Sequence, residues 1–146
     1  NGGVNGGGTI FSITLDGKLT ALYSFASNGN SHPYGALTQG TDGSFYGVTS
    51  DFERPTAGSI FRLSVGLGPF VTTLPGFGQV GATVKILGTH LTGTTSVAFN
   101  GTAAAFTVVS NTLITATVPP GAGNGKAQVT TPEGTLLSNL PFRVIP

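Results

Sequence analysis

The chain has 146 residues and little charge: six Lys and Arg stand against five Asp and Glu, for a net charge of +1. Disordered chains combine low hydrophobicity with high net charge, whereas 38% of these residues are hydrophobic. The basic residues are scattered singly, so no basic stripe for nucleic acid is expected. No Cys is present, which excludes disulfides and thiolate metal sites. No run of about 18 apolar residues occurs, so no membrane insertion is expected.

The composition favours strands over helices. The 24 Gly and 9 Pro residues interrupt every stretch in which a helix could form. Short β-rich runs separated by turn residues remain, and this pattern predicts an all-β chain. Low charge together with many Thr, Ser, Asn and Gly residues is typical of secreted bacterial β-proteins. We therefore expect a secreted, extracellular or cell-surface location.

The first part of the chain, residues 1–67, alternates strands with turns. Asp16-Gly17 and Thr41-Asp42-Gly43 each lie between two β-rich runs, and both predict hairpins. Residues 26–35 and 51–58 are rich in turn formers or polar residues and are expected to be loops. The expected strands are residues 9–14, 19–25, 36–40, 44–50 and 59–65.

One strand of this part occurs twice. GTIFSIT (8–14) matches GSIFRLS (58–64) at an offset of 50, with Ser12 against Arg62 as the one dissimilar pair. A fixed period of about 20–50 residues is the signature of repeat architectures. One period contains four expected strands, as in a propeller blade. Residues 1–67 are therefore predicted to hold one and a quarter propeller-like, four-stranded repeats.

Such an incomplete set of repeats cannot close a ring of about four to eight blades. It would leave open strand edges, which invite pairing with another chain. Two interpretations remain open. The chain is a piece of a longer protein, or other copies of it complete the sheet by strand addition. The expected partners are accordingly other copies of the chain or the remainder of a longer one.

The second part, residues 68–146, has the spacing of a small β-sandwich. Val84 and Ile86 alternate with other residues and predict one core-facing side of a strand. Ile114, Ala116 and Val118 likewise share one face of another strand. Asn100-Gly101 supplies a tight turn. The expected strands are residues 82–88, 95–101, 104–111, 112–119, 126–134 and 140–146.

The second part resembles the IPT/TIG family of immunoglobulin-like domains. The resemblance rests on LPGFGQVGATVKILG (74–88), VAFNG (97–101), ITATVP (114–119) and KAQVTTPEG (126–134). It implies an Ig-like sandwich without intrinsic catalysis. DNA binding, which some members carry out through basic loops, is not implied, because the corresponding loops here contain one Lys.

The first part resembles tandem repeats of secreted bacterial proteins of the choice-of-anchor kind. The residues that carry this resemblance are GTIFSIT (8–14), DGKLTALYSF (16–25) and GTDGSFYGVTS (40–50). Repeats of this kind are expected to close into a propeller, and a TIG-like domain often follows them.

Catalytic, cofactor and metal sites are not predicted. The two His residues, His32 and His90, are too few for a His-rich metal site, and Asp16 and Asp42 are explained by turn geometry. An enzyme would require Asp51, Glu53 and His32 to converge. Loop residues that could contact a ligand are His32, Tyr34, Phe52 and Arg54.

The sequence therefore predicts a non-catalytic structural or adhesive module that self-assembles by strand or edge completion. The alternative is an accessory carbohydrate-binding piece of a secreted polysaccharide-active protein, in which Tyr34 would stack on sugar. The Phe residues of the strands are expected in the core. They are Phe11, Phe25, Phe45, Phe61, Phe99 and Phe106.

Overall fold

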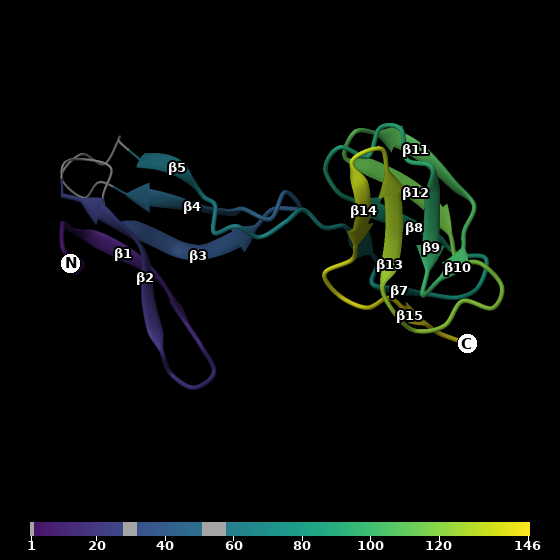
Figure 1. Ribbon diagram of the computed structural model, residues 1–146, viewed down its shortest axis with the longest axis horizontal. Helices are drawn as coiled ribbons and strands as arrows, with labels where there is room; N and C mark the ends of the chain where they lie inside the picture. Colours follow the sequence, from purple (N-terminus) through teal and green to yellow (C-terminus); the bar gives the residue numbers. More distant parts are fainter. Residues whose placement is uncertain (1, 28–31, 51–57) are drawn as a thin grey trace. The chain divides into compact units, whose positions relative to one another are not determined.

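The computed structural model describes residues 2–27, 32–50 and 58–146 (Figure 1). All regular elements among these residues are β-strands, so the predicted all-β class is confirmed. The chain divides into two compact units. The N-terminal unit comprises residues 1–40 and 44–67, and the C-terminal unit comprises residues 41–43 and 68–146.

The N-terminal unit contains two antiparallel sheets. Strand β1 (Gly6–Ile13) pairs with β2 (Leu19–Ala26). The second sheet has the order β3-β4-β5 and is built from β3 (Pro33–Gln39), β4 (Phe45–Ser50) and β5 (Gly58–Leu63). Strand β3 begins three residues earlier than predicted, because Pro33 and Tyr34 pair with the end of β4.

Both hairpins predicted in residues 1–67 are confirmed, since β1 pairs antiparallel with β2 and β3 pairs antiparallel with β4. Gly17 has φ 86° and donates its N–H to the Thr14 carbonyl over 2.9 Å, while Thr14 donates to the Lys18 carbonyl over 3.0 Å. Gly43 has φ 82°. Left-handed backbone of this kind is open to glycine without a steric penalty. The Asp-Gly and Thr-Asp-Gly sequences thus determine where the chain reverses.

The predicted four-stranded repeat sheet is not observed, and no sheet of the described residues closes on itself. Strands β1 and β2 form a sheet of their own, which joins the β3-β4-β5 sheet through the His32 N–H to Gly7 O hydrogen bond and through a ring contact on one face of that sheet. Phe25 is 6% exposed, and its ring lies 5.1 Å from that of Phe61 at 66°. This contact removes the apolar Phe25 ring from water, which stabilises the unit.

The C-terminal unit is a two-sheet sandwich. One sheet has the order β10-β9-β13-β14 and the other has the order β11-β12-β8-β6, while β15 and β7 form a parallel pair. The strands are β6 (Thr72–Leu74), β7 (Phe77–Gly78), β8 (Thr83–Leu87), β9 (Ser96–Phe99), β10 (Thr102–Ala103), β11 (Phe106–Ser110), β12 (Leu113–Thr117), β13 (Ala127–Thr131), β14 (Gly134–Leu137) and β15 (Arg143–Val144).

The core of the sandwich lies between these sheets. Val84 and Ile86 of β8 are at most 1% exposed, as their alternation predicted. On β12 and just beyond it, Ile114, Ala116 and Val118 are the buried set. Burying a Val or Ile side chain fully stabilises a fold by about 1.5–3 kcal/mol, so this face explains why the unit folds as a sandwich.

Four strands of the sandwich were missed by the sequence analysis: β6, β7, β10 and β14. Each spans two to four residues, which is too short for an alternating pattern to be recognised. The predicted strand 140–146 is confirmed only at Arg143–Val144.

Candidate interaction surface

The β3-β4-β5 sheet exposes apolar side chains on one face. Tyr34, Val48 and Ile60 lie opposite one another across the three strands and are 67%, 47% and 80% exposed. In the next row, Tyr46 pairs with Arg62. We call these five residues the open face. A contiguous apolar surface of this kind marks an interaction site more often than scattered exposed residues do.

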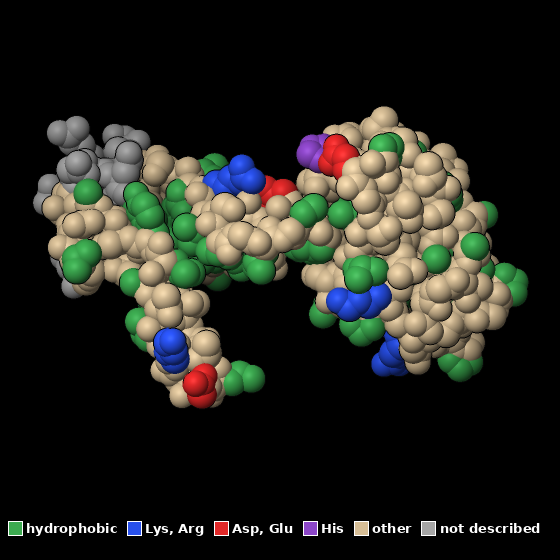
Figure 2. Space-filling view, in the orientation of Figure 1, with side chains coloured by type: hydrophobic (Ala, Val, Ile, Leu, Met, Phe, Trp, Pro, Cys, Tyr) green, Lys and Arg blue, Asp and Glu red, His purple; other side chains and the backbone are tan. Residues whose placement is uncertain are grey.

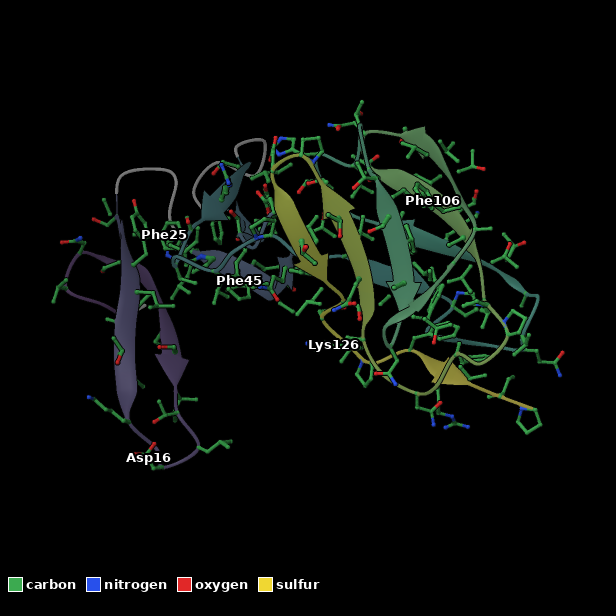
Figure 3. The ribbon with its side chains drawn as sticks, turned by 45° about the vertical axis from the view of Figure 1, so that its right-hand side comes forward. Asp16, Phe25, Phe45, Phe106 and Lys126 are labelled. Carbon is green, nitrogen blue, oxygen red and sulfur yellow. The ribbon has the colours of Figure 1, made fainter. Side chains whose placement is uncertain are left out.

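The opposite face of the same sheet is covered. Thr49 is 5% exposed, and its Oγ1 lies 2.7 Å from the Ser59 Oγ. Phe61, on this face, contacts the ring of Phe25 from the hairpin. Figure 3 shows Phe25 and Phe45 in the part of the unit where the hairpin and the sheet meet. One face of the sheet is thus internal to the unit, and the other faces outward.

The repeated sequence places one isoleucine in each environment. Ile10 of β1 and Ile60 of β5 occupy the same repeat position, 50 residues apart. Ile10 is 7% exposed, whereas Ile60 is 80% exposed. The side chain that is buried by the fold in the first copy is therefore uncovered in the second.

The outer edge of β5 is also unpaired within the described sheet, where β5 neighbours β4 alone. Ser50 N–H donates to the His32 carbonyl, and Ser44 O accepts from Gly40, both toward β3. Backbone groups of alternate residues point to opposite sides of a strand. Phe45, Gly47 and Thr49 therefore direct their backbone groups toward β5. Their register partners Leu63, Phe61 and Ser59 point back toward β4, which leaves the backbone groups of Ile60 and Arg62 on the outer edge.

An apolar groove of about 470 Å³ lies on the same unit, between the hairpin and the sheet. Hydrophobic side chains gather over the body of this unit in Figure 2. Phe11 lines the groove and is 54% exposed, so the prediction that it belongs to the core is wrong. The groove is lined by Phe11, Ser12, Leu22, Leu37, Phe45, Leu63, Val65 and Leu67.

Of the predicted ligand-contact residues, the structure describes His32 and Tyr34. His32 has φ 64°, donates its N–H to Gly7 O over 2.7 Å and accepts from Ser50 N–H over 3.0 Å, so its backbone ties β1 to β4. Tyr34 lies on the open face. Phe52 and Arg54 lie outside the described residues, as do Asp51 and Glu53.

The C-terminal unit contains a polar pair that the sequence analysis did not bring together. His90 Nδ1 lies 3.2 Å from Glu133 Oε2 beside a cavity of about 250 Å³. Both side chains are more than two-thirds exposed, so the pair is solvated and worth little to stability. Within the described part of the chain, no group of three His, Cys, Asp or Glu residues could hold a metal ion.

The hairpin tip carries one perturbed carboxyl group. A hydrogen bond from the Thr14 side chain, and then one from the backbone of Asp16 itself, lowers the pKa of Asp16 below its ordinary value. Asp16 lies at the far end of the hairpin in Figure 3. The shift fits a residue that holds a turn, because both bonds are local.

Comparison with known proteins identifies one region of the chain. The family model of the IPT/TIG domain matches residues 69–144. The chain is similar in structure to SGBP-B from a complex xyloglucan utilization locus in Bacteroides uniformis, with 17% identity and a TM-score of 0.43. That similarity covers 92% of this chain and 35% of the other, so the chain spans about a third of that protein. A search of curated proteins found no match. Among the described residues, no helix is long and apolar enough to cross a membrane.

Proposed function

The chain belongs to the IPT/TIG domain family, and we propose that it is a non-catalytic structural or adhesive module that associates with further copies of itself. The sandwich is the self-sufficient part, because its core is closed between two sheets. The N-terminal unit provides the association surface.

The difference between Ile10 and Ile60 carries this proposal. The two side chains hold equivalent repeat positions, yet one is 7% and the other 80% exposed. If a partner buried Ile60 to the extent that Ile10 is buried, apolar surface would be removed from water. Such burial stabilises association by about 25 cal/mol per Å² of apolar surface. A second copy carries the same repeated sequence as residues 8–14 and 58–64, so it offers matching chemistry.

Size-exclusion chromatography with light scattering tests the proposal on the whole chain. We expect the mass to rise with concentration above that of a 14.6 kDa monomer. Ile60→Lys should shift the equilibrium toward monomer, because it places a charge on the contact surface. Val109→Lys is the matched control, since Val109 is 56% exposed on the sandwich. A chain that stays monomeric at every concentration would contradict self-association.

A carbohydrate-binding function is the second candidate, and one observation favours it. Tyr34 and Tyr46 present two aromatic rings on the same open face. Aromatic side chains provide a large apolar surface with a polar end, which suits sugar rings. Pull-down on insoluble glycans measures this binding. Tyr34→Ala should abolish retention, and Val109→Ala should leave it unchanged.

The location that we propose is extracellular or on the cell surface. Its support is compositional: the chain has few charges and is rich in Thr, Ser, Asn and Gly. We likewise propose that the chain is non-catalytic, since the resemblance to IPT/TIG domains implies a sandwich without intrinsic catalysis. His90 and Glu133 form an exposed, solvated pair.

A further inference from the structure

We propose that the outer edge of β5 is a docking site for an extended strand of the β2 type, with the sequence pattern of residues 19–25, LTALYSF. The proposal rests on the proposed function, because it names the edge and the partner through which the N-terminal unit would associate. It follows from comparing how β1 and β5, the two copies of the repeated strand, use their edges.

The first copy shows which edge accepts a β2-type strand. Thr14 N–H donates to Lys18 O, so Thr14 directs its backbone groups toward β2. By alternation along β1, Ser12 and Ile10 do the same, although the register shifts between Ile10 and Phe11, where β2 has one extra residue. Their register partners on β2 are Thr20 and Tyr23. The edge of β1 formed by Ile10 and Ser12 is therefore the edge that β2 occupies.

The second copy presents the same edge without a neighbour among the described strands. Ile60 and Arg62, the equivalents of Ile10 and Ser12, direct their backbone groups away from β4. Strand β5 is last in its sheet. The two copies thus use opposite edges: β1 pairs through the edge that β5 leaves open. The outer strand of a sheet is a template for strand addition.

The sequence that follows each copy explains why the chain itself supplies a pairing strand for this edge of β1 but not for that of β5. After β1 it continues as TLDGKLTALYSF, which turns at Asp16-Gly17 and returns along the strand. After β5 it continues as SVGLGPF, which lacks the Asp-Gly turn and leads into the sandwich sequence. The matching occupant is therefore a β2-type strand supplied by another polypeptide.

The repeat also defines the register. A strand docked on β5 as β2 docks on β1 places its Tyr23 equivalent opposite Ile60 and its Thr20 equivalent opposite Arg62. Aromatic and β-branched residues facing each other across antiparallel strands form favourable pairs. The partner should therefore carry an aromatic residue three positions after its Thr.

A labelled peptide of residues 15–27, LDGKLTALYSFAS, tests the inference against the full chain by fluorescence anisotropy. We expect saturable binding. Two further peptides carry one N-methyl group each, at Thr20, whose N–H would face β5, or at Leu19, whose N–H would face away. Methylation at Thr20 should weaken binding at least about fivefold, as expected from one backbone hydrogen bond. Methylation at Leu19 should weaken it less.

Two protein variants locate the docked strand. Ile60→Pro removes the N–H on the outer edge, a position where an edge strand accepts proline. Ile60→Ala keeps that N–H while also removing the isoleucine side chain. Binding should be at least about fivefold weaker for Ile60→Pro than for Ile60→Ala. If Ile60→Pro and Ile60→Ala bind the peptide equally, and the two N-methyl peptides also bind equally, the peptide does not dock on the outer edge of β5. That result would overturn the inference.

Light scattering on the same samples separates the two proposals. Self-association without peptide binding would overturn the docking site and leave the proposed function standing. Peptide binding with the predicted N-methyl and proline effects, in a chain that stays monomeric, would support the docking site and contradict self-association. The N-methyl comparison uses the unsubstituted protein, so it decides the question even where Ile60→Pro does not fold.

Discussion

In the N-terminal unit, the side chain on the neighbouring strand determines which residue type fits at Gly47. Gly47 of β4 lies opposite Phe61 of β5, and a Cβ built at Gly47 would come within 2.5 Å of the Phe61 ring and 2.8 Å of Leu37. A glycine is needed here because the aromatic ring occupies the space that a side chain would fill. The ring of Phe61 in turn contacts Phe25, so Gly47 supports the junction between the sheets.

Gly47→Ala should therefore destabilise the N-terminal unit by about 1–3 kcal/mol, the usual cost of overpacking. The measurement is chemical unfolding followed by tyrosine fluorescence, since all three Tyr residues lie in this unit. Gly2→Ala in the same unit is the control, because nothing lies within 4 Å of a Cβ there. Equal stability of the two variants would contradict the close approach of Phe61.

Asp16 gives a second prediction at this scale. Its lowered pKa comes first from the Thr14 side chain, so Thr14→Val should raise that pKa toward the ordinary value. A folded-state pKa below the unfolded one stabilises the fold above the unfolded pKa, and this contribution is lost as pH falls through the folded pKa. Proton titration of Asp16 by NMR measures the effect. An unchanged pKa in Thr14→Val would rule out the hydrogen bond as the cause.

At the scale of elements, tight turns decide which strands become neighbours. Asn100-Gly101 joins β9 to β10, with φ 47° at Asn100 and 83° at Gly101. Two consecutive left-handed residues match the twist of a two-residue hairpin. A Cβ at Gly125 would lie 2.3 Å from Asn100 Oδ1, so the Asn100 side chain is packed against the neighbouring backbone. The prediction that these residues serve as a turn is confirmed.

Gly101→Val should destabilise the sandwich, because a β-branched residue is strained at positive φ. We expect a loss of roughly 1–3 kcal/mol of unfolding free energy. Gly101→Asn is the matched control, since Asn tolerates this conformation better. No atom lies within 4 Å of a Cβ at Gly101, so the difference between the variants measures backbone strain alone. If Gly101→Val and Gly101→Asn lower the unfolding free energy equally, backbone strain does not explain the loss of stability.

At the scale of the whole molecule, the two units differ in how their apolar surface is buried. The sandwich encloses a core of twelve buried residues, among which Phe99 and Phe142 pack at 4.8 Å. Among the described residues of the N-terminal unit, the buried apolar side chains are Ile10 and Phe25, while Ile13, Tyr34 and Ile60 are well exposed. A unit with little internal burial depends more on partners for its stability.

Thermal unfolding of the chain should therefore show two transitions. The transition of the N-terminal unit should come first and should rise in temperature with protein concentration, because association stabilises the folded form. The transition of the sandwich should be independent of concentration. Residues 68–146 expressed alone should give the same second transition by circular dichroism. A single transition shared by both units would contradict their independence.

Much of the fold followed from the sequence because its causes are local. Asp16-Gly17 and Asn100-Gly101 predicted turns, and Val84 with Ile86 predicted a core face, since turn geometry and strand alternation depend on neighbours along the chain. Strand spacing predicted a small sandwich, whereas its family was indicated by the resemblance of its sequence motifs to IPT/TIG domains, whose family model matches residues 69–144. The very short strands β6, β7 and β10 gave too little pattern.

The tertiary structure alone decided the candidate site. Alternation placed residues on two faces, but whether the hairpin pairs by its edge or packs on a face depends on contacts such as Phe25 with Phe61, 36 positions apart. The same holds for His90 and Glu133, which are separated by 43 positions. The sequence by itself determined that Ile10 and Ile60 are equivalent. Only the tertiary structure determined that the first is buried and the second is exposed, because burial depends on distant segments that no local pattern records.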